Sequence, residues 1–215
     1  TAIIGGTGSG KSTLINLIPR FYDVDSGRVL VDGVDVRHLT QEDLRARIGF
    51  VPQQAVLFAG TVADNIRFGN ATAADEEIRR AAETAQAMEF ISSMADGFEG
   101  AIAQGGANVS GGQKQRLAIA RALVRAPEIY VFDDSFSALD FKTDAQLRAS
   151  LKNETAGATV LIVAQRIGTV MDADQIIVLD DGEVAGIGKH RELLSSCPVY
   201  REIASSQLSE EELTA

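Results

Sequence analysis

The chain has 215 residues, of which 45% are hydrophobic and 23% charged, and its formal net charge at pH 7 is −10. This length and composition are those of a globular domain with room for a buried core, and the acidic balance argues against a general nucleic-acid binder. The single cysteine, Cys197, excludes an internal disulfide and suits a reducing compartment, and no apolar run reaches the roughly 20 residues of a membrane span.

The chain opens on a short apolar run, Ala2 to Ile4, a glycine-rich turn, and a second apolar stretch from Leu14. This pattern predicts strand, loop and helix, and Gly5-x-x-x-x-Gly10-Lys11-Ser12 fits the phosphate-binding P-loop. Glycines let backbone N–H groups turn inward, and the helix start adds a positive dipole end. We expect nine residues to bind nucleotide: Gly5, Gly6, Thr7, Gly8, Ser9, Gly10, Lys11, Ser12 and Thr13.

Two of these residues have assigned roles. Lys11 is expected to reach the outer phosphates, and the Ser12 hydroxyl to ligate the Mg²⁺ that accompanies them. A P-loop strand is normally an interior strand, so we also expect further strands upstream of Thr1.

In the first half of the chain, the sequence pattern predicts mostly short helices and strands. They are a strand at 28–33, a helix at 40–47 opened by a capping box, a strand at 48–51, two or three helices between 61 and 94, a loop at 96–109, and a helix at 113–125 with Ser110 as N-cap. The second half alternates strands and helices. We expect strands at 128–133, 158–163, 176–179 and 183–187, a helix at 143–153, two short helices after the last strand, and a polar, acidic tail from Ser209. Strand–helix alternation around a P-loop predicts an α/β fold with a largely parallel sheet and ligands at the carboxyl ends of its strands.

Acidic residues end the apolar strand at 128–133. A buried strand that delivers Asp133 to the sheet edge is how P-loop proteins hold Mg²⁺, and Asp134, next along, could face the water that attacks the γ-phosphate. The alternative is an ordinary Asp-Asp turn.

A second candidate anion site is the stretch Ser110-Gly111-Gly112-Gln113, which opens a helix with exposed N–H groups and a hydroxyl. Standing alone, it is equally a plain glycine-rich helix cap.

These motifs together resemble the nucleotide-binding domain of an ABC transporter. In order, Gly5 to Thr13 resembles Walker A, Val51-Pro52-Gln53 the Q-loop, Val109 to Gln113 the signature, Ile129 to Asp134 Walker B, and Ser137-Ala138-Leu139-Asp140 the D-loop. Arg20-Phe-Tyr-Asp and Leu57 to Ile66 resemble the exporter branch. The resemblance implies a P-loop NTPase core at 1–58 and 126–205, an inserted helical lobe at about 59–125, and an acidic tail at 206–215.

The resemblance also implies partners and a place in the cell. Two such domains pair head to tail, so that Walker A and B of one and the signature of the other enclose each ATP with its Mg²⁺. Gln53 would touch Mg²⁺ and the attacking water, and its loop would meet a coupling helix of a transmembrane domain absent from this chain. The domain would lie at the cytoplasmic face of the plasma membrane, and an adenine-stacking aromatic would precede Thr1.

Two positions depart from the family pattern. Family members that hydrolyse ATP briskly carry Glu after the Walker B Asp and His in the switch loop, where this chain has Asp134 and Gln165. Asp is one methylene shorter, so its oxygens fall about 1.5 Å short of the water. Gln can donate a hydrogen bond to the γ-phosphate but cannot be charged. A third departure, Gln104 in place of Glu, carries less weight.

These substitutions lead to a hypothesis and two alternatives. Asp-for-Glu with Gln-for-His resembles the slow half of a heterodimeric exporter, whose different partner chain carries Glu and His and hydrolyses ATP at a site completed by the intact signature. One alternative is a nucleotide clamp that does not hydrolyse. The other, a soluble ABC ATPase acting on nucleic acid or ribosomes, is disfavoured by the acidic charge and by the lack of sustained heptads in the roughly hundred residues between Walker A and signature.

Overall fold

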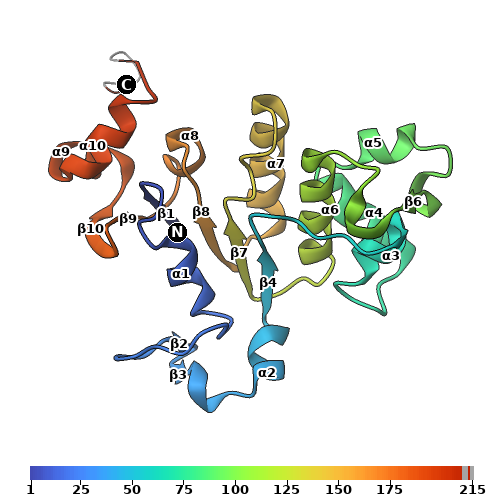
Figure 1. The fold of residues 1–215 in the computed structure, drawn as a ribbon, viewed down its shortest axis with the longest axis horizontal. Coiled ribbons are helices and arrows are strands. Elements are labelled where there is room, and N and C mark those ends of the chain that lie inside the picture. The colour runs from blue at the N-terminus through green and yellow to red at the C-terminus, as the bar shows by residue number, and fades with distance from the viewer. Residues whose placement is uncertain (210–212, 214–215) are drawn as a thin grey trace. The chain divides into compact units, whose positions relative to one another are not determined.

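The structure is a computed structural model that describes residues 1–209 and 213. The chain divides into two compact units (Figure 1). Unit 1 comprises residues 1–48, 131–134 and 160–215, and unit 2 comprises residues 49–130 and 135–159. The helices of the expected lobe at 59–125 lie in unit 2, which extends further at both ends, and the expected domain boundaries stay a prediction.

Parallel pairing around β1 organises the sheet. β1 (Ala2–Gly5) pairs in parallel with β8 (Thr159–Val163), with Ala2 opposite Ile162, and with β9 (Ile176–Asp180), with Gly5 opposite Leu179. β10 (Glu183–Gly188) runs antiparallel to β9 after the Asp181-Gly182 turn. The full strand order is β10-β9-β1-β8-β7-β4, where β7 is Ile129–Asp133 and β4 is Ile48–Val51. The prediction of an α/β fold with a mostly parallel sheet is confirmed.

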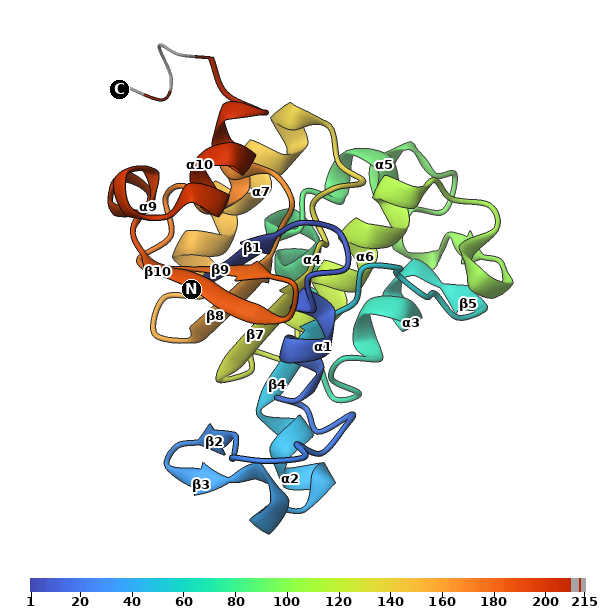
Figure 2. The same ribbon diagram turned by 60° about the vertical axis from the view of Figure 1, so that its left-hand side comes forward.

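Three helices cover one side of this sheet in unit 1. They are α8 (Ile167–Val170), α9 (His190–Ser196) and α10 (Pro198–Ser205), all labelled in Figure 1, and Figure 2 shows α9 and α10 in red. The two predicted C-terminal helices are confirmed, whereas α8, a single turn, was not predicted. Their shared core with the strands consists of buried residues: Ala2, Ile4, Ala164, Ile167, Val170, Ile176, Val178, Leu193, Cys197, Tyr200 and Ala204. Cys197 is therefore a core residue.

The predicted strand at 28–33 is wrong in its extent. The segment forms a small hairpin of β2 (Leu30–Val31) and β3 (Val34–Asp35). Asp32 and Gly33 between them both have positive φ, 51° and 79°, which is the backbone of a tight hairpin turn and cannot continue a strand. A 3₁₀ turn, η1 (Val36–His38), and α2 (Gln41–Ala46) follow, and the predicted N-cap Thr40 accepts from the Asp43 N–H.

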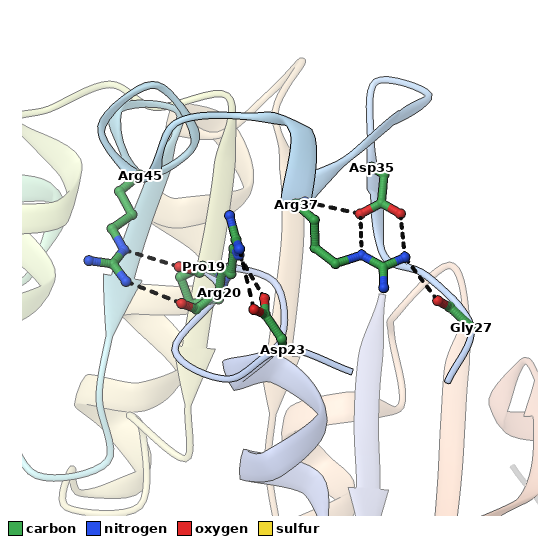
Figure 3. Close-up of polar contacts among 7 residues, drawn as sticks. All are labelled: Pro19, Arg20, Asp23, Gly27, Asp35, Arg37 and Arg45. Carbon is green, nitrogen blue, oxygen red and sulfur yellow. Dashed lines mark hydrogen bonds and ion pairs between the residues drawn. The ribbon is translucent and has the colours of Figure 1, made fainter. Parts of the chain in front are cut away.

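Arginines tie this hairpin and α2 to the segment that follows α1 (Lys11–Asn16), as Figure 3 shows. Arg45 of α2 donates to the carbonyl oxygens of Pro19 and Arg20, at 3.1 and 3.2 Å. Arg37 pairs with Asp35 at 2.7 Å and reaches the Gly27 carbonyl, and this pairing holds the pKa of Asp35 well below its usual range. Backbone that lacks ladder partners is satisfied here by side chains.

Unit 2 is mostly helical. It contains α3 (Val62–Arg67), α4 (Asp75–Thr84), α5 (Met88–Ser93), α6 (Gly111–Leu123) and α7 (Phe141–Glu154), with α3 and α4 packed on α6. α6 begins at Gly111, two residues before the prediction, because Ser110 forms a full capping box with Gln113. The predicted loop at 96–109 is wrong in part, since it contains η2 (Gly97–Glu99), β6 (Ala101–Ile102) paired with β5 (Gly60–Thr61), and η3 (Gln104–Gly106).

Arg121 of α6 holds the segment between β4 and α3. Its guanidinium donates to the carbonyls of Val56 and Asn65 and to Asn65 Oδ1, at 2.8 to 3.0 Å. It also lies over the rings of Phe58 and Phe68, 5.1 and 5.4 Å from their centroids. One planar cation therefore satisfies three acceptors and two aromatic faces.

Two observations concern the ends of the chain and the membrane. Within the described residues, no helix combines the length and the apolar character needed to cross a bilayer. Much of the predicted acidic tail, residues 210–212 and 214–215, lies outside the described residues.

Because Lys cannot reproduce the fork of Arg121, we expect Arg121→Lys to lower the stability of unit 2 by about 2 kcal/mol. The control is Arg80→Lys in the same unit, whose exposed pair with Glu154 should matter little. Thermal unfolding of both variants measures the difference. Equal melting temperatures for the two variants would contradict the importance of the Arg121 contacts.

Candidate functional site

The loop between β1 and α1 is shaped by its glycines. A Cβ on Gly5 would stand 2.1 Å from the Leu179 carbonyl oxygen, so β1 and β9 can approach this closely only because residue 5 has no side chain. Gly8 and Gly10 have φ of 83° and 92°, a backbone that L side chains rarely adopt. The predicted P-loop residues Gly6, Thr7, Gly8 and Thr13 are exposed, and Ser9 is buried.

Lys11 lies folded beneath this loop. It is buried, and its Nζ donates to the carbonyls of Gly5 and Gly6, at 2.9 and 2.6 Å, and to Ser9 Oγ at 3.3 Å. Burial lowers the pKa of Lys11, and the carboxylates of Asp134 and Asp133 oppose that shift. The loop is thus wrapped around a fixed positive charge.

Ser12 and Asp133 form an oxygen pair at the end of β7. Ser12 Oγ donates to Asp133 Oδ1 at 3.0 Å. Burial raises the pKa of Asp133, the hydrogen bond from Ser12 lowers it, and the neighbouring Asp134 raises it. A hydroxyl and a carboxylate are the hard oxygen donors that Mg²⁺ prefers, and Mg²⁺ usually takes only one or two protein ligands beside phosphates and water. The donor set fits that ion.

Asp134 and Gln165 are in direct contact. Gln165 Nε2 donates to Asp134 Oδ2 at 3.1 Å, and the Asp134 N–H donates to the Val163 carbonyl at 3.0 Å. Asp134 has φ of 44°, a left-handed backbone that Asp tolerates better than most residues. The two positions that depart from the family pattern are therefore physical neighbours.

The remaining predicted residues lie in unit 2. Gln53 is exposed just after β4, and the adjacent backbone is anchored by Gln115 Nε2 to the Pro52 carbonyl, at 3.1 Å, and by Ser135 Oγ to the Val51 carbonyl, at 3.0 Å. The signature residues Ser110, Gly111, Gly112 and Gln113 form the N-cap and first turn of α6. Ser137 is exposed, and Asp140 caps α7 by accepting from the Thr143 N–H at 2.9 Å.

Sequence reasoning missed two glutamines that support this machinery. Gln115 lies buried on α6, and Gln207, two residues beyond α10, contacts the backbone at Gln165. Gln115 could have been flagged as a polar residue among the apolar positions of a helix. Gln207 lies 42 positions from its partner and gives no local signal.

Comparison with known proteins places these features in a family. Residues 1–137 match the family described as ABC transporter. The chain belongs to the ABC transporter family. A bacterial Atm1-family ABC exporter, solved with ATP bound, superposes with a TM-score of 0.93 at 41% identity over 97% of this chain and 36% of that one. The chain therefore has the fold of the ATP-binding domain of an ABC exporter.

Similar ABC transporter proteins come from distant organisms. An uncharacterized ABC transporter ATP-binding protein of Mycobacterium tuberculosis is 53% identical over 210 residues, and the match covers 96% of this chain and 36% of the relative. The YfiB protein of Bacillus subtilis, an uncharacterized ABC transporter ATP-binding protein, is 49% identical over 98% of this chain and 36% of its own length. The ATP-binding cassette sub-family B member 6 of Xenopus tropicalis is 45% identical over 97% of this chain and 24% of its own length. The chain thus spans between 24% and 36% of the length of these relatives.

The close approach at Gly5 leads to a first prediction for this site. Gly5→Ala forces a Cβ into the Leu179 carbonyl and should destabilise unit 1 by about 1–3 kcal/mol, the usual range for overpacking. Gly6→Ala is the matched control, since a Cβ there meets nothing within 4 Å. Urea unfolding of both variants tests this, and a similar loss in each would show that loop glycines in general, and not the β1–β9 contact, set the stability.

The raised pKa of Asp133 leads to a second prediction. A carboxyl whose pKa is higher in the folded than in the unfolded state, where it is about 3.9, makes the protein less stable as pH rises through the folded value. Asp133→Asn should therefore be more stable than wild type at pH 7, and the difference should shrink toward pH 4. Urea unfolding at several pH values measures it, and a difference that grows on acidification would contradict the role of burial.

Proposed function

We propose that this chain is the ATP-binding, slowly hydrolysing domain of an ABC exporter, and that it pairs with a second nucleotide-binding domain to drive a substrate across a membrane. The observation that carries the finer part of the proposal is the contact of Gln165 Nε2 with Asp134 Oδ2, at 3.1 Å, where brisk family members have His and Glu. The family match and the fold support the coarser part.

The residues of unit 1 support tight binding of Mg²⁺–ATP. Exposed loop residues from Gly6 to Gly8 can turn N–H groups to phosphate oxygens, and Lys11 supplies a positive charge whose position three acceptors fix. Ser12 and Asp133 supply oxygen ligands for Mg²⁺, which when bound neutralises charge on the outer phosphates.

Slow turnover follows from the residues that would act on water. Asp134 is a carboxylate and can accept a proton, but it extends about 1.5 Å less far than Glu. A misplaced base forfeits part of the roughly 10²–10⁴-fold that general base catalysis provides. Gln165 can donate from Nε2 to a γ-phosphate oxygen or to Asp134, and it adds no positive charge. Both changes affect turnover more than binding.

The intact signature supports a partner chain that hydrolyses faster. Ser110, Gly111, Gly112 and Gln113 stand at the start of α6, where the Ser110 hydroxyl and free helix N–H groups can meet the phosphates bound by another domain. Ser137 and Asp140 of the D-loop would lie along the same interface. We propose that the partner carries Glu and His, so that activity resides mainly at the site this signature completes.

Coupling to a membrane domain is assigned to the loop around Gln53. Side-chain hydrogen bonds to the carbonyls of Val51, Pro52 and Val56 fix the backbone on both sides of this exposed glutamine. Its side chain can then reach Mg²⁺ and water, or move when a coupling helix contacts the loop. With a transmembrane domain attached, the domain would lie at the cytoplasmic face of the plasma membrane.

A nucleotide clamp that binds and releases ATP without hydrolysis is the second candidate. The same pair, Asp134 and Gln165, favours it, because a site without a well-placed base can still close on ATP. Action on nucleic acid finds no support in a chain with net charge −10.

Steady-state ATP hydrolysis by the complete transporter tests the proposal. The double substitution Asp134→Glu with Gln165→His should raise kcat of this site at least tenfold with little change in KM, because it restores the reach of the base and a chargeable donor. Lys11→Ala is the control for loss of binding.

Two other results would change the assignment. Brisk hydrolysis by the wild-type site, unchanged in the double variant, would mean that Asp134 is an adequate base. No hydrolysis in either form, with ATP still bound, would favour the clamp.

A further inference from the structure

The loop that presents Gln165 is held by one side chain from the end of the chain. Gln207 Nε2 donates to the Gln165 carbonyl at 2.8 Å, and Gln207 Oε1 accepts from the Ile167 N–H at 2.8 Å. A single amide group thus grips the loop backbone on both sides of Arg166. Its orientation is fixed by chemistry, since a carbonyl can only accept and an N–H can only donate.

The backbone of Gln207 is hydrogen-bonded to α10, a helix that packs in the core of unit 1. Its N–H donates to the Ala204 carbonyl at 3.0 Å, continuing the last turn of α10. Ala204 and Tyr200 of that helix are fully buried in the core that contains β1 and β9. The side chain of Gln207 is exposed, so it fills no core space, and its visible role is to reach the loop.

Gln207 is connected through hydrogen bonds to both candidate catalytic residues, Gln165 and Asp134. The residue whose carbonyl Gln207 binds is the one whose side chain donates to Asp134, and Asp134 is in turn bonded to Val163 of the same segment. The amide carbon of Gln165, Cδ, is only three bonds from Cα. Fixing the backbone of residue 165 therefore limits where the side-chain amide can lie.

We propose that Gln207 is a positioning residue of the nucleotide site: by binding the Gln165 carbonyl and the Ile167 N–H, it sets where the Gln165 amide meets the outermost phosphate. This inference rests on the proposed function of Gln165 as a γ-phosphate donor. It assigns to the C-terminal segment a part in distinguishing ATP from ADP.

Gln207 also has a simpler role, which is to cap the helix α8. Ile167 is the first residue of α8, and its N-cap, Arg166, makes no side-chain cap bond, so Gln207 Oε1 also serves as a cap for that helix. A cap alone would affect stability and leave nucleotide preference unchanged.

The test measures the ratio of affinities for Mg²⁺–AMP-PNP and Mg²⁺–ADP in the complete protein, by displacement of a fluorescent nucleotide. Gln165→Ala should lower the preference for AMP-PNP about tenfold, the worth of one hydrogen bond to a charged group. Gln207→Met, which keeps the length of the side chain and loses both bonds, should lower it at least about threefold, a part of that loss. In the Gln165→Ala background, Gln207→Met should have no further effect.

Two more variants separate positioning from capping. Gln207→Glu keeps an acceptor for the Ile167 N–H but puts an oxygen, which cannot donate, against the Gln165 carbonyl, so it should keep the α8 cap and still lose nucleotide preference. Ser206→Ala is the neighbouring control, since the Ser206 hydroxyl donates within its own turn, to the Ile203 carbonyl.

The outcomes are distinct. If Gln165→Ala lowers the preference and the Gln207 variants do not, or if they lower it equally with and without Gln165, the positioning role is wrong. If Gln165→Ala itself leaves the preference unchanged, the proposed function of Gln165 fails first.

Discussion

The buried ammonium of Lys11 is the constraint on which the candidate nucleotide site depends. A charge removed from water costs several kcal/mol unless it is paired and hydrogen-bonded. The carbonyls of Gly5 and Gly6 and the hydroxyl of Ser9 meet that need, while Asp133 and Asp134 supply opposite charge nearby. The loop conformation follows, because carbonyls that turn inward to the ammonium require glycine where the chain passes β9.

Local signals in the sequence predicted most of what surrounds this charge. The P-loop spacing, the acid at the end of β7, and the caps at Thr40 and Ser110 are each readable within a few residues, since each depends on backbone geometry that its own side chains satisfy. The predicted strand at 28–33 is too long because Asp32 and Gly33 form the turn of a hairpin and do not extend the strand. The two-residue strands β5 and β6 and the single turn α8 are too short to show a period.

Hydrogen bonds between residues far apart in the sequence could not be predicted. Gln207 and Gln165 are 42 residues apart, and Arg121 and Val56 are 65 apart. In each case a polar side chain satisfies a backbone group that no ladder reaches, and only the fold decides which group that is. The resemblance identified Gln165 as a departure from the family but could not show that it bonds to Asp134, the other departure. A neutral amide donates to a carboxylate without changing its own charge, whereas a histidine in that place would titrate.

The helix α6 connects two motifs of unit 2, the signature stretch and the loop around Gln53. Its first turn is formed by Gly111, Gly112 and Gln113, its Gln115 binds the Pro52 carbonyl, and its Arg121 binds the Val56 carbonyl. At 1.5 Å per residue, its 13 residues form a rod about 20 Å long. Pro52 and Val56, which lie on the two sides of Gln53, are thus hydrogen-bonded to the same helix whose first turn is the signature stretch. Because one helix contacts both segments, any displacement of α6 changes the backbone contacts of the Gln53 loop together with the position of the signature turn.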